Sequence, residues 1–145
     1  MNRKHRVIIT TLFIILIIVL NSLFIVADNA NQKQQAIDKY FLEQLNEINL
    51  EIYSQSMNLQ TELSYNLKNV VNLIKYTSYD KYDNLRETLN EIYKFCVKNN
   101  EEDVLFDKNL AVRIDENLLN LYNALYKKDK NKVTEFMVTI NDILK

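Results

Sequence analysis

The residue types that most often carry chemistry are scarce in this chain. It has one histidine, His5, and one cysteine, Cys96. Histidine titrates near neutral pH and is the commonest metal ligand, but His5 lies among the basic residues at the N-terminus. The rest of the sequence therefore has no imidazole for acid–base work or metal binding.

Cys96 lies in phase with the apolar positions Leu85, Leu89 and Ile92, at helical spacing. A free cysteine in such a stripe behaves as a small buried hydrophobe, so the pattern predicts a core thiol. The alternative is an intermolecular disulfide, because a lone cysteine outside the membrane has no partner in its own chain. A core position rarely reaches a neighbouring molecule, which disfavours that alternative.

Carboxylates are densest at Glu101, Glu102, Asp103 and Asp107. A calcium loop needs alternating oxygen ligands around a central glycine, and a phosphate-binding loop also needs glycine. The chain contains no glycine. We therefore expect no metal, no cofactor and no catalytic residues, and we interpret these carboxylates as the acidic first turn of a helix.

Three tyrosines, Tyr76, Tyr79 and Tyr82, cluster in the segment YTSYDKYDN. Tyrosine offers a large contact area at low entropic cost and is enriched at binding hot spots. At a turn between helices, the three rings would form a recognition tip for a partner. The favoured alternative is that they pack over the end of the core while their hydroxyls stay in water.

The composition favours helices as the elements that position these residues. Glycine and proline are both absent, so no strong helix breaker exists, whereas tight β-turns and bulges normally need glycine. Apolar residues make up 48% and charged residues 26% of the chain. We predict an all-α fold.

Residues 7–27 contain no charged side chain. Such a run matches the roughly 20 apolar residues that span a bilayer. It is longer than the apolar part of a signal peptide, and Ile25 fits a cleavage site poorly beside Ala27. We expect an uncleaved signal-anchor; a cleaved signal peptide is the alternative.

Orientation follows from Arg3, Lys4 and Arg6, which precede the run, while Asp28 follows it. Positive residues remain in the cytoplasm. The sequence thus predicts a single-pass cell-membrane protein with a cytoplasmic N-terminus and an extracytoplasmic C-terminal domain. Within the run, Asn21 is a candidate for hydrogen bonding across a helix pair; the favoured alternative is a lone helix with Asn21 near the outer boundary, because no small-xxx-small pattern accompanies it.

Downstream, apolar residues keep helical spacing. A first seam shifts register near Ser54–Ser56, which leaves one long helix or two over residues 28–78. Asp80 is expected to cap the next helix, which ends at Asn99–Asn100. Asn100 is expected to cap the helix after that, and Asp129 is expected to cap the last helix. The stripes must bury against each other, giving an antiparallel bundle of four or five helices. The seams are Ile37, Phe41, Leu45, Ile48, Ile52 and Leu59; Leu63, Leu67, Val70, Ile74 and Thr77; Val104, Ala111, Ile114, Leu118, Leu121 and Leu125; and Val133, Phe136, Met137, Ile140, Ile143 and Leu144.

Three segments result: a basic stub (1–6), the membrane anchor (7–27) and a helical domain (28–145). Beyond the anchor, acidic residues outnumber basic ones, which argues against nucleic-acid binding. The only basic cluster, Lys127, Lys128, Lys130 and Lys132, is interrupted by Asp129 and is interpreted as a solvated helix connection.

These features favour a non-catalytic, membrane-anchored interaction protein of the cell envelope, an adaptor or subunit whose partner is another envelope protein or itself. An alternative is a ligand-sensing input module, because a span leading into a helical bundle resembles the ligand-binding half of bacterial chemoreceptors and sensor kinases. That resemblance is one of arrangement, without a shared motif. A third hypothesis is an immunity or exclusion protein.

Overall fold

The computed structural model describes the backbone of residues 3–145 and the side chains of residues 11–145. All regular secondary structure in the described residues is helical, which confirms the predicted fold class. The chain divides into two compact units, one ending at Ala36 and the other spanning Ile37–Lys145.

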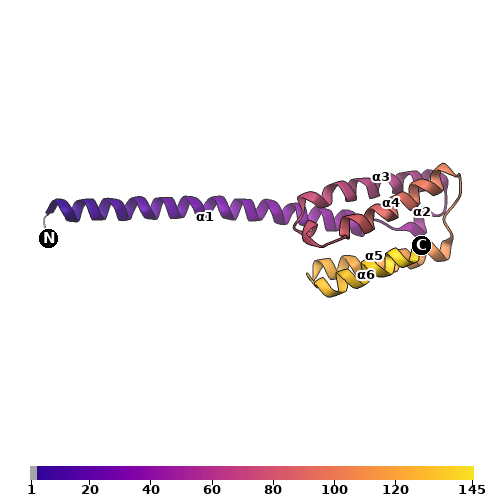
Figure 1. Ribbon diagram of the computed structural model, residues 1–145. Helices are drawn as coiled ribbons and strands as arrows, with labels where there is room; N and C mark the ends of the chain where they lie inside the picture. Colours follow the sequence, from indigo (N-terminus) through magenta and orange to yellow (C-terminus); the bar gives the residue numbers. More distant parts are fainter. Residues whose placement is uncertain (1–2) are drawn as a thin grey trace. The chain divides into compact units, whose positions relative to one another are not determined.

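The first unit belongs to α1, the helix Arg3–Asn46 (Figure 1). Its apolar side chains from Leu12 to Val26 are exposed and have no protein cover. Among the described residues, α1 is the one helix that is long and apolar enough to cross a membrane, a property that a signal sequence near an N-terminus shares. The side chains of Arg3, Lys4 and Arg6 lie outside the described residues.

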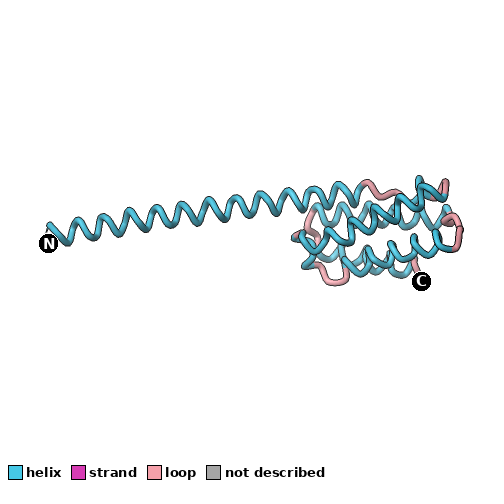
Figure 2. The backbone as a smooth tube through the Cα atoms, turned by 90° about the horizontal axis from the view of Figure 1, so that it is seen from above, coloured by secondary structure: helices cyan, strands magenta, loops and turns pink. Residues whose placement is uncertain are grey.

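The second unit is a bundle built from the end of α1 and five further helices (Figures 1 and 2). Two 3₁₀ helices, η1 (Ile74–Tyr76) and η2 (Ser78–Lys81), connect the third helix to the fourth. The α3–α4 and α5–α6 pairs form the main packed pairs, and α2 contacts both α3 and α5. The helices are α2 (Leu50–Tyr53), α3 (Met57–Leu73), α4 (Leu85–Glu101), α5 (Lys108–Tyr126) and α6 (Lys130–Ile143).

One apolar core fills this unit, formed by the stripes that the sequence predicts. Removing such side chains from water contributes roughly 1.5–3 kcal/mol each. Fully buried members come from every main helix: Phe41 and Leu45, Leu63 and Leu67, Leu89 and Ile92, Ile114 and Leu121, and Val133 and Ile140.

The segment that follows α1 is interrupted twice. α1 ends at Asn46, so Ile48 reaches the core from a turn, and Ile52, expected in the buried seam, is 53% exposed. The second break is the Ser54–Ser56 turn, where the Ser56 hydroxyl accepts a hydrogen bond from the Leu59 amide and caps α3. Residues 28–78 therefore form neither one helix nor two: the end of α1 is followed by α2, α3 and η1.

The prediction that Asp80 caps the next helix is wrong. The Thr77 hydroxyl caps η2 by accepting a hydrogen bond from the Tyr79 amide, and Asp80 lies within η2. α4 starts later, at Leu85, after Asn84 with a φ of 67°. Asparagine tolerates this left-handed backbone better than most residues.

The prediction that Asn100 starts the third helix is also wrong. Its amide group donates hydrogen bonds to the Gln60 carbonyl and the Ser64 hydroxyl, so its side chain is engaged with α3. α5 begins at Lys108, capped by the Asp107 carboxylate. Val104, expected in the buried seam, is consequently 47% exposed in the connecting loop.

The last boundary is as predicted: the Asp129 carboxylate accepts the Lys132 amide and caps α6. α4 and α5 both end in Schellman turns. In these turns the Val104 amide bonds to the Asn99 carbonyl, and the Asp129 amide bonds to the Ala124 carbonyl. Because the chain has no glycine, Asp103 (φ 54°) and Lys128 (φ 55°) occupy the left-handed positions.

Candidate functional site

The α3–α4 turn separates the three clustered tyrosines. Tyr79 and Tyr82 are buried, with their ring centroids 6.3 Å apart, and Tyr79 also lies 5.6 Å from the Phe41 ring. Tyr76 is 58% exposed. Two of the rings thus close the end of the core, and Tyr76 is the member of the cluster that a partner can contact without unfolding the turn.

Asp38 fixes this turn from the last part of α1. Its carboxylate accepts hydrogen bonds from the Ser78 amide at 2.7 Å and from the Ser78 hydroxyl at 2.5 Å. Burial, together with the negative charge of Asp38, raises the pKa of the Tyr79 phenol to about 12. The Tyr79 hydroxyl therefore stays protonated at physiological pH and serves packing instead of proton transfer.

A shallow groove of about 280 Å³ lies between α1 and the end of α3. Two exposed tyrosine side chains, Tyr40 and Tyr76, line it together with the half-buried Leu73. The remaining lining residues are uncharged amides: Gln44, Asn69 and Asn72. A concave surface of aromatic rings and uncharged amides has the composition of a protein-contact site.

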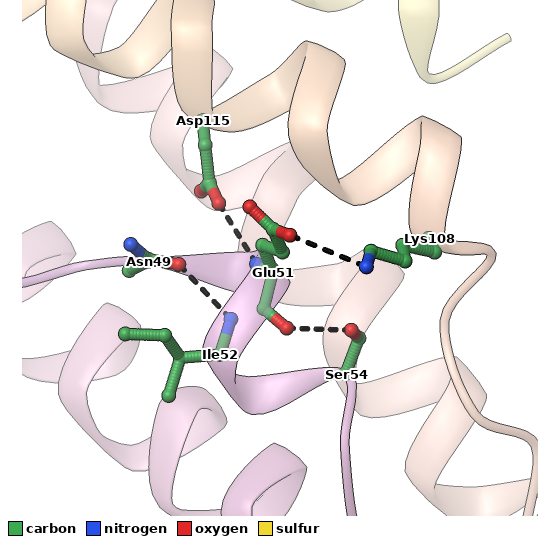
Figure 3. Close-up of polar contacts among 6 residues, drawn as sticks. All are labelled: Asn49, Glu51, Ile52, Ser54, Lys108 and Asp115. Carbon is green, nitrogen blue, oxygen red and sulfur yellow. Dashed lines mark hydrogen bonds and ion pairs between the residues drawn. The ribbon is translucent and has the colours of Figure 1, made fainter.

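A second candidate region surrounds α2, shown in Figure 3. The Asp115 carboxylate of α5 accepts hydrogen bonds from the Leu50 amide at 2.7 Å and the Glu51 amide at 2.8 Å. The Asn49 side chain accepts the Ile52 amide. Asp115 of α5 and Asn49, the residue that precedes α2, thus satisfy the first amides of α2, which is too short to be stable alone.

The charged side chain of α2, Glu51, also has a partner. The Glu51 carboxylate pairs with the Lys108 ammonium at 3.5 Å, and the Ser54 hydroxyl donates to the Glu51 carbonyl (Figure 3). Burial raises the pKa of the Asp115 carboxyl, although the two amide hydrogen bonds oppose the shift. Beside it lies a pocket of about 320 Å³ lined by Asn46, Asn49, Asp115, Glu116 and Tyr122, among others.

A buried polar network joins α3 to the loop between α4 and α5. Gln60 is fully buried; its side-chain amide donates to the Val104 carbonyl at 3.1 Å, and its side-chain oxygen accepts the Phe106 amide at 2.7 Å. One side chain therefore holds both ends of that loop segment. Gln60 is not among the residues predicted from the sequence, although positions 60, 63, 67, 70 and 74 follow a 3–4 spacing that indicates a buried stripe.

The remaining candidates lie apart from these regions. Cys96 is fully buried, as predicted, and burial raises the pKa of its thiol far above the usual range. Asn21 is on the exposed apolar run of α1, next to Ser22, whose hydroxyl donates to the Ile18 carbonyl. Among the side chains of residues 11–145, no three histidine, cysteine or acidic residues come together as metal ligands do.

No protein-family model matches this sequence, and comparisons with curated proteins and with solved structures find no significant match.

Proposed function

We propose that this chain is a non-catalytic, membrane-anchored interaction protein of the cell envelope. The observation that supports the anchor is the exposed, uncharged and largely apolar surface from Leu12 to Val26, which has the length and composition of a bilayer span. With Arg3, Lys4 and Arg6 before the span, the N-terminus is cytoplasmic and the bundle is extracytoplasmic.

The partner site in this proposal is the groove formed by Tyr40, Leu73 and Tyr76. Its two aromatic rings, Tyr40 and Tyr76, are exposed, and Leu73 between them packs against the core. A tyrosine side chain has only two χ angles, so it loses little conformational entropy on binding. Rigid aromatic anchors around a shallow depression are typical of interface hot spots. The partner is another envelope protein or a second copy of the chain.

Site-specific crosslinking in intact membranes tests the proposal. A photo-crosslinking amino acid placed at position 40 or 76 of the full chain should capture one discrete protein, identified by mass spectrometry. The Tyr40→Ala/Tyr76→Ala double variant should lose a co-purifying partner, whereas Tyr65→Ala, which removes a more exposed ring outside the groove, should retain it. Equal capture from positions 65 and 76 would contradict the proposal.

A second candidate function, ligand sensing, has one observation in its favour. The pocket beside Asp115 has a volume at the lower end of the range for small-molecule sites. In this role the bundle would act on another membrane protein. Thermal stabilisation of the full chain by a small polar molecule, abolished by Glu116→Ala at the pocket rim, would support sensing over scaffolding.

A further inference from the structure

Two turns that are far apart in the sequence lie at one end of the second unit. Figures 1 and 2 both show the α5–α6 turn at the same end as the α3–α4 turn. An electrostatic interaction between Tyr79 and Tyr122 agrees with this proximity. The unit also begins here, because Asp38 bonds to Ser78 of the α3–α4 turn. The chain thus enters the bundle at the end where both turns lie.

This end carries a concentration of exposed positive charge, which we call the basic end. Acidic residues at this end are fewer, namely Asp38, Asp80, Asp83 and Asp129, and the Asp38 and Asp129 carboxylates accept hydrogen bonds from backbone amides. Within the described side chains, none of the basic-end lysines is ion-paired with a carboxylate. The basic end consists of Lys75, Lys81, Lys127, Lys128, Lys130 and Lys132, all exposed.

The opposite end of the unit has the reverse charge. The α4–α5 loop and its flanks carry Glu101, Glu102, Asp103 and Asp107. The nearby lysines are already neutralised, because Lys98 pairs with Glu102 and Lys108 pairs with Glu51. The bundle is therefore electrically polar along its length, and its two ends suit different surroundings.

Exposed tyrosines accompany the basic-end lysines. Tyr76 is 58% exposed and Tyr126 is 67% exposed, the latter stacked on Tyr122 at 6.4 Å. Tyrosine is enriched at membrane–water interfaces, because its ring is apolar and its hydroxyl is polar. Lysine and tyrosine together on one surface have the chemistry that matches lipid headgroups.

We propose that the basic end docks on the surface of an anionic bilayer, with its lysines against the lipid phosphates. Charge complementarity selects this occupant: clustered lysines near a membrane are attracted to anionic lipids. Residues 28–36 connect the first residue of the bundle to the apolar run, so the tether emerges from the docking end. This inference goes beyond the proposed function and requires no protein partner.

The test uses the full chain reconstituted in vesicles. A fluorophore is attached at Asn131→Cys, between two basic-end lysines, or at Leu105→Cys in the acidic loop; the buried Cys96 stays unlabelled. The vesicles contain phosphatidylcholine alone or with phosphatidylglycerol, plus a headgroup spin-labelled lipid as quencher. We expect quenching at position 131 to exceed that at position 105 several-fold, only with phosphatidylglycerol, and to vanish in 1 M salt, where the Debye length is about 3 Å.

Charge removal gives the decisive comparison. Each of Lys127→Gln, Lys128→Gln, Lys130→Gln and Lys132→Gln should lower the ratio of docked to undocked bundle by about fivefold. Replacing Lys94, Lys98, Lys108 and Lys145 by glutamine removes the same charge elsewhere and should leave quenching unchanged. Equal quenching in both vesicle types, or quenching insensitive to the basic-end substitutions, would overturn the proposal. The proposal would also be overturned if the basic-end substitutions abolished protein crosslinking from position 76 but left the lipid quenching intact, because the basic end would then bind protein.

Discussion

Asp38 and Ser78 are joined by two hydrogen bonds across 40 positions of sequence. One carboxylate, placed by α1, thereby satisfies both the amide and the hydroxyl of the first residue of η2. The contact also places a negative charge close to the buried Tyr79 phenol. The end of the core is thus sealed by a ring that strongly resists ionisation.

Replacing Tyr79 with phenylalanine should remove part of the alkaline sensitivity of the fold; the buried Cys96 thiol, whose pKa is also raised, contributes a further part in both proteins. The Tyr79 pKa is raised from 10.0 to about 12, so the folded state retains a proton that the unfolded state loses. The stabilisation is complete below pH 10 and is lost as the pH rises to 12, at about 1.4 kcal/mol per pH unit. Urea unfolding of the full chain in detergent, repeated between pH 9 and 12, measures this slope.

Tyr65→Phe is the control for that experiment, because it removes a hydroxyl from an exposed ring on α3. Its alkaline slope should equal that of the wild type. A Tyr79→Phe variant that also keeps the wild-type slope would show that another group governs alkaline unfolding.

The Asp115 carboxyl should make the free energy of unfolding depend on pH in the acidic range. Burial raises the pKa of its carboxyl, so its protonated form is favoured by folding. That contribution is fully present below the unfolded pKa, near 3.9, and is lost as the pH rises through the folded pKa. The free energy of unfolding of the wild type should therefore increase relative to Asp115→Asn as the pH falls from 7 toward 4.

Asp115→Ala should lower stability at pH 7 by about 1–3 kcal/mol, because the Leu50 and Glu51 amides lose their acceptor. Glu116→Ala, at the exposed neighbouring position, should change it by less than about 0.5 kcal/mol. Hydrogen exchange of the two amides provides a direct readout: their protection should fall in Asp115→Ala only. Unchanged protection would mean that α2 does not need this cap.

Glycine at the two Schellman turns should stabilise the bundle. Asp103 and Lys128 have φ values of 54° and 55°, where a Cβ atom is unfavourable and glycine is not. Asp103→Gly and Lys128→Gly should each raise the free energy of unfolding by about 0.5–1 kcal/mol. Lys127→Gly is the matched control: its φ is −80°, so the same substitution should destabilise by a similar amount. Thermal unfolding ranks the three variants.

Gln60→Leu should cost about 2–3 kcal/mol, although it places an apolar residue in an apolar core. The Phe106 amide and the Val104 carbonyl would lose their buried partner. Asn58→Leu, at an exposed site on the same helix, should be nearly neutral. Should Gln60→Leu prove as stable as the wild type, water must replace the side chain in that loop.

The helices and their buried faces could be predicted from sequence because their periodicity is local. The stripe containing Leu89, Ile92 and Cys96 needs no knowledge of its neighbours. The predicted helix boundaries were wrong where a side chain that is distant in sequence bonds to a group at the end of the helix. The Ser78 amide bonds to Asp38, and Asn100 is engaged by Ser64, so neither Asp80 nor Asn100 begins a helix.

The candidate contact surface was predicted only in part. Tyr76 was included in the tyrosine cluster, but Tyr40 is remote in sequence and joins it through the packing of α1 against α3. The basic end was not predicted from the sequence for the same reason. Lys75 and Lys81 precede Lys127 by about half the helical domain, and only the fold places the two turns at one end.

The Asp115 contact also imposes an order on synthesis. The α2 amides leave the ribosome first, and their acceptor follows 65 positions later. At about 5–20 residues per second, this gap lasts several seconds. The Leu50 and Glu51 amides therefore lack their acceptor until Asp115 has been synthesised, and α2 reaches its final geometry only when most of the polypeptide has been translated.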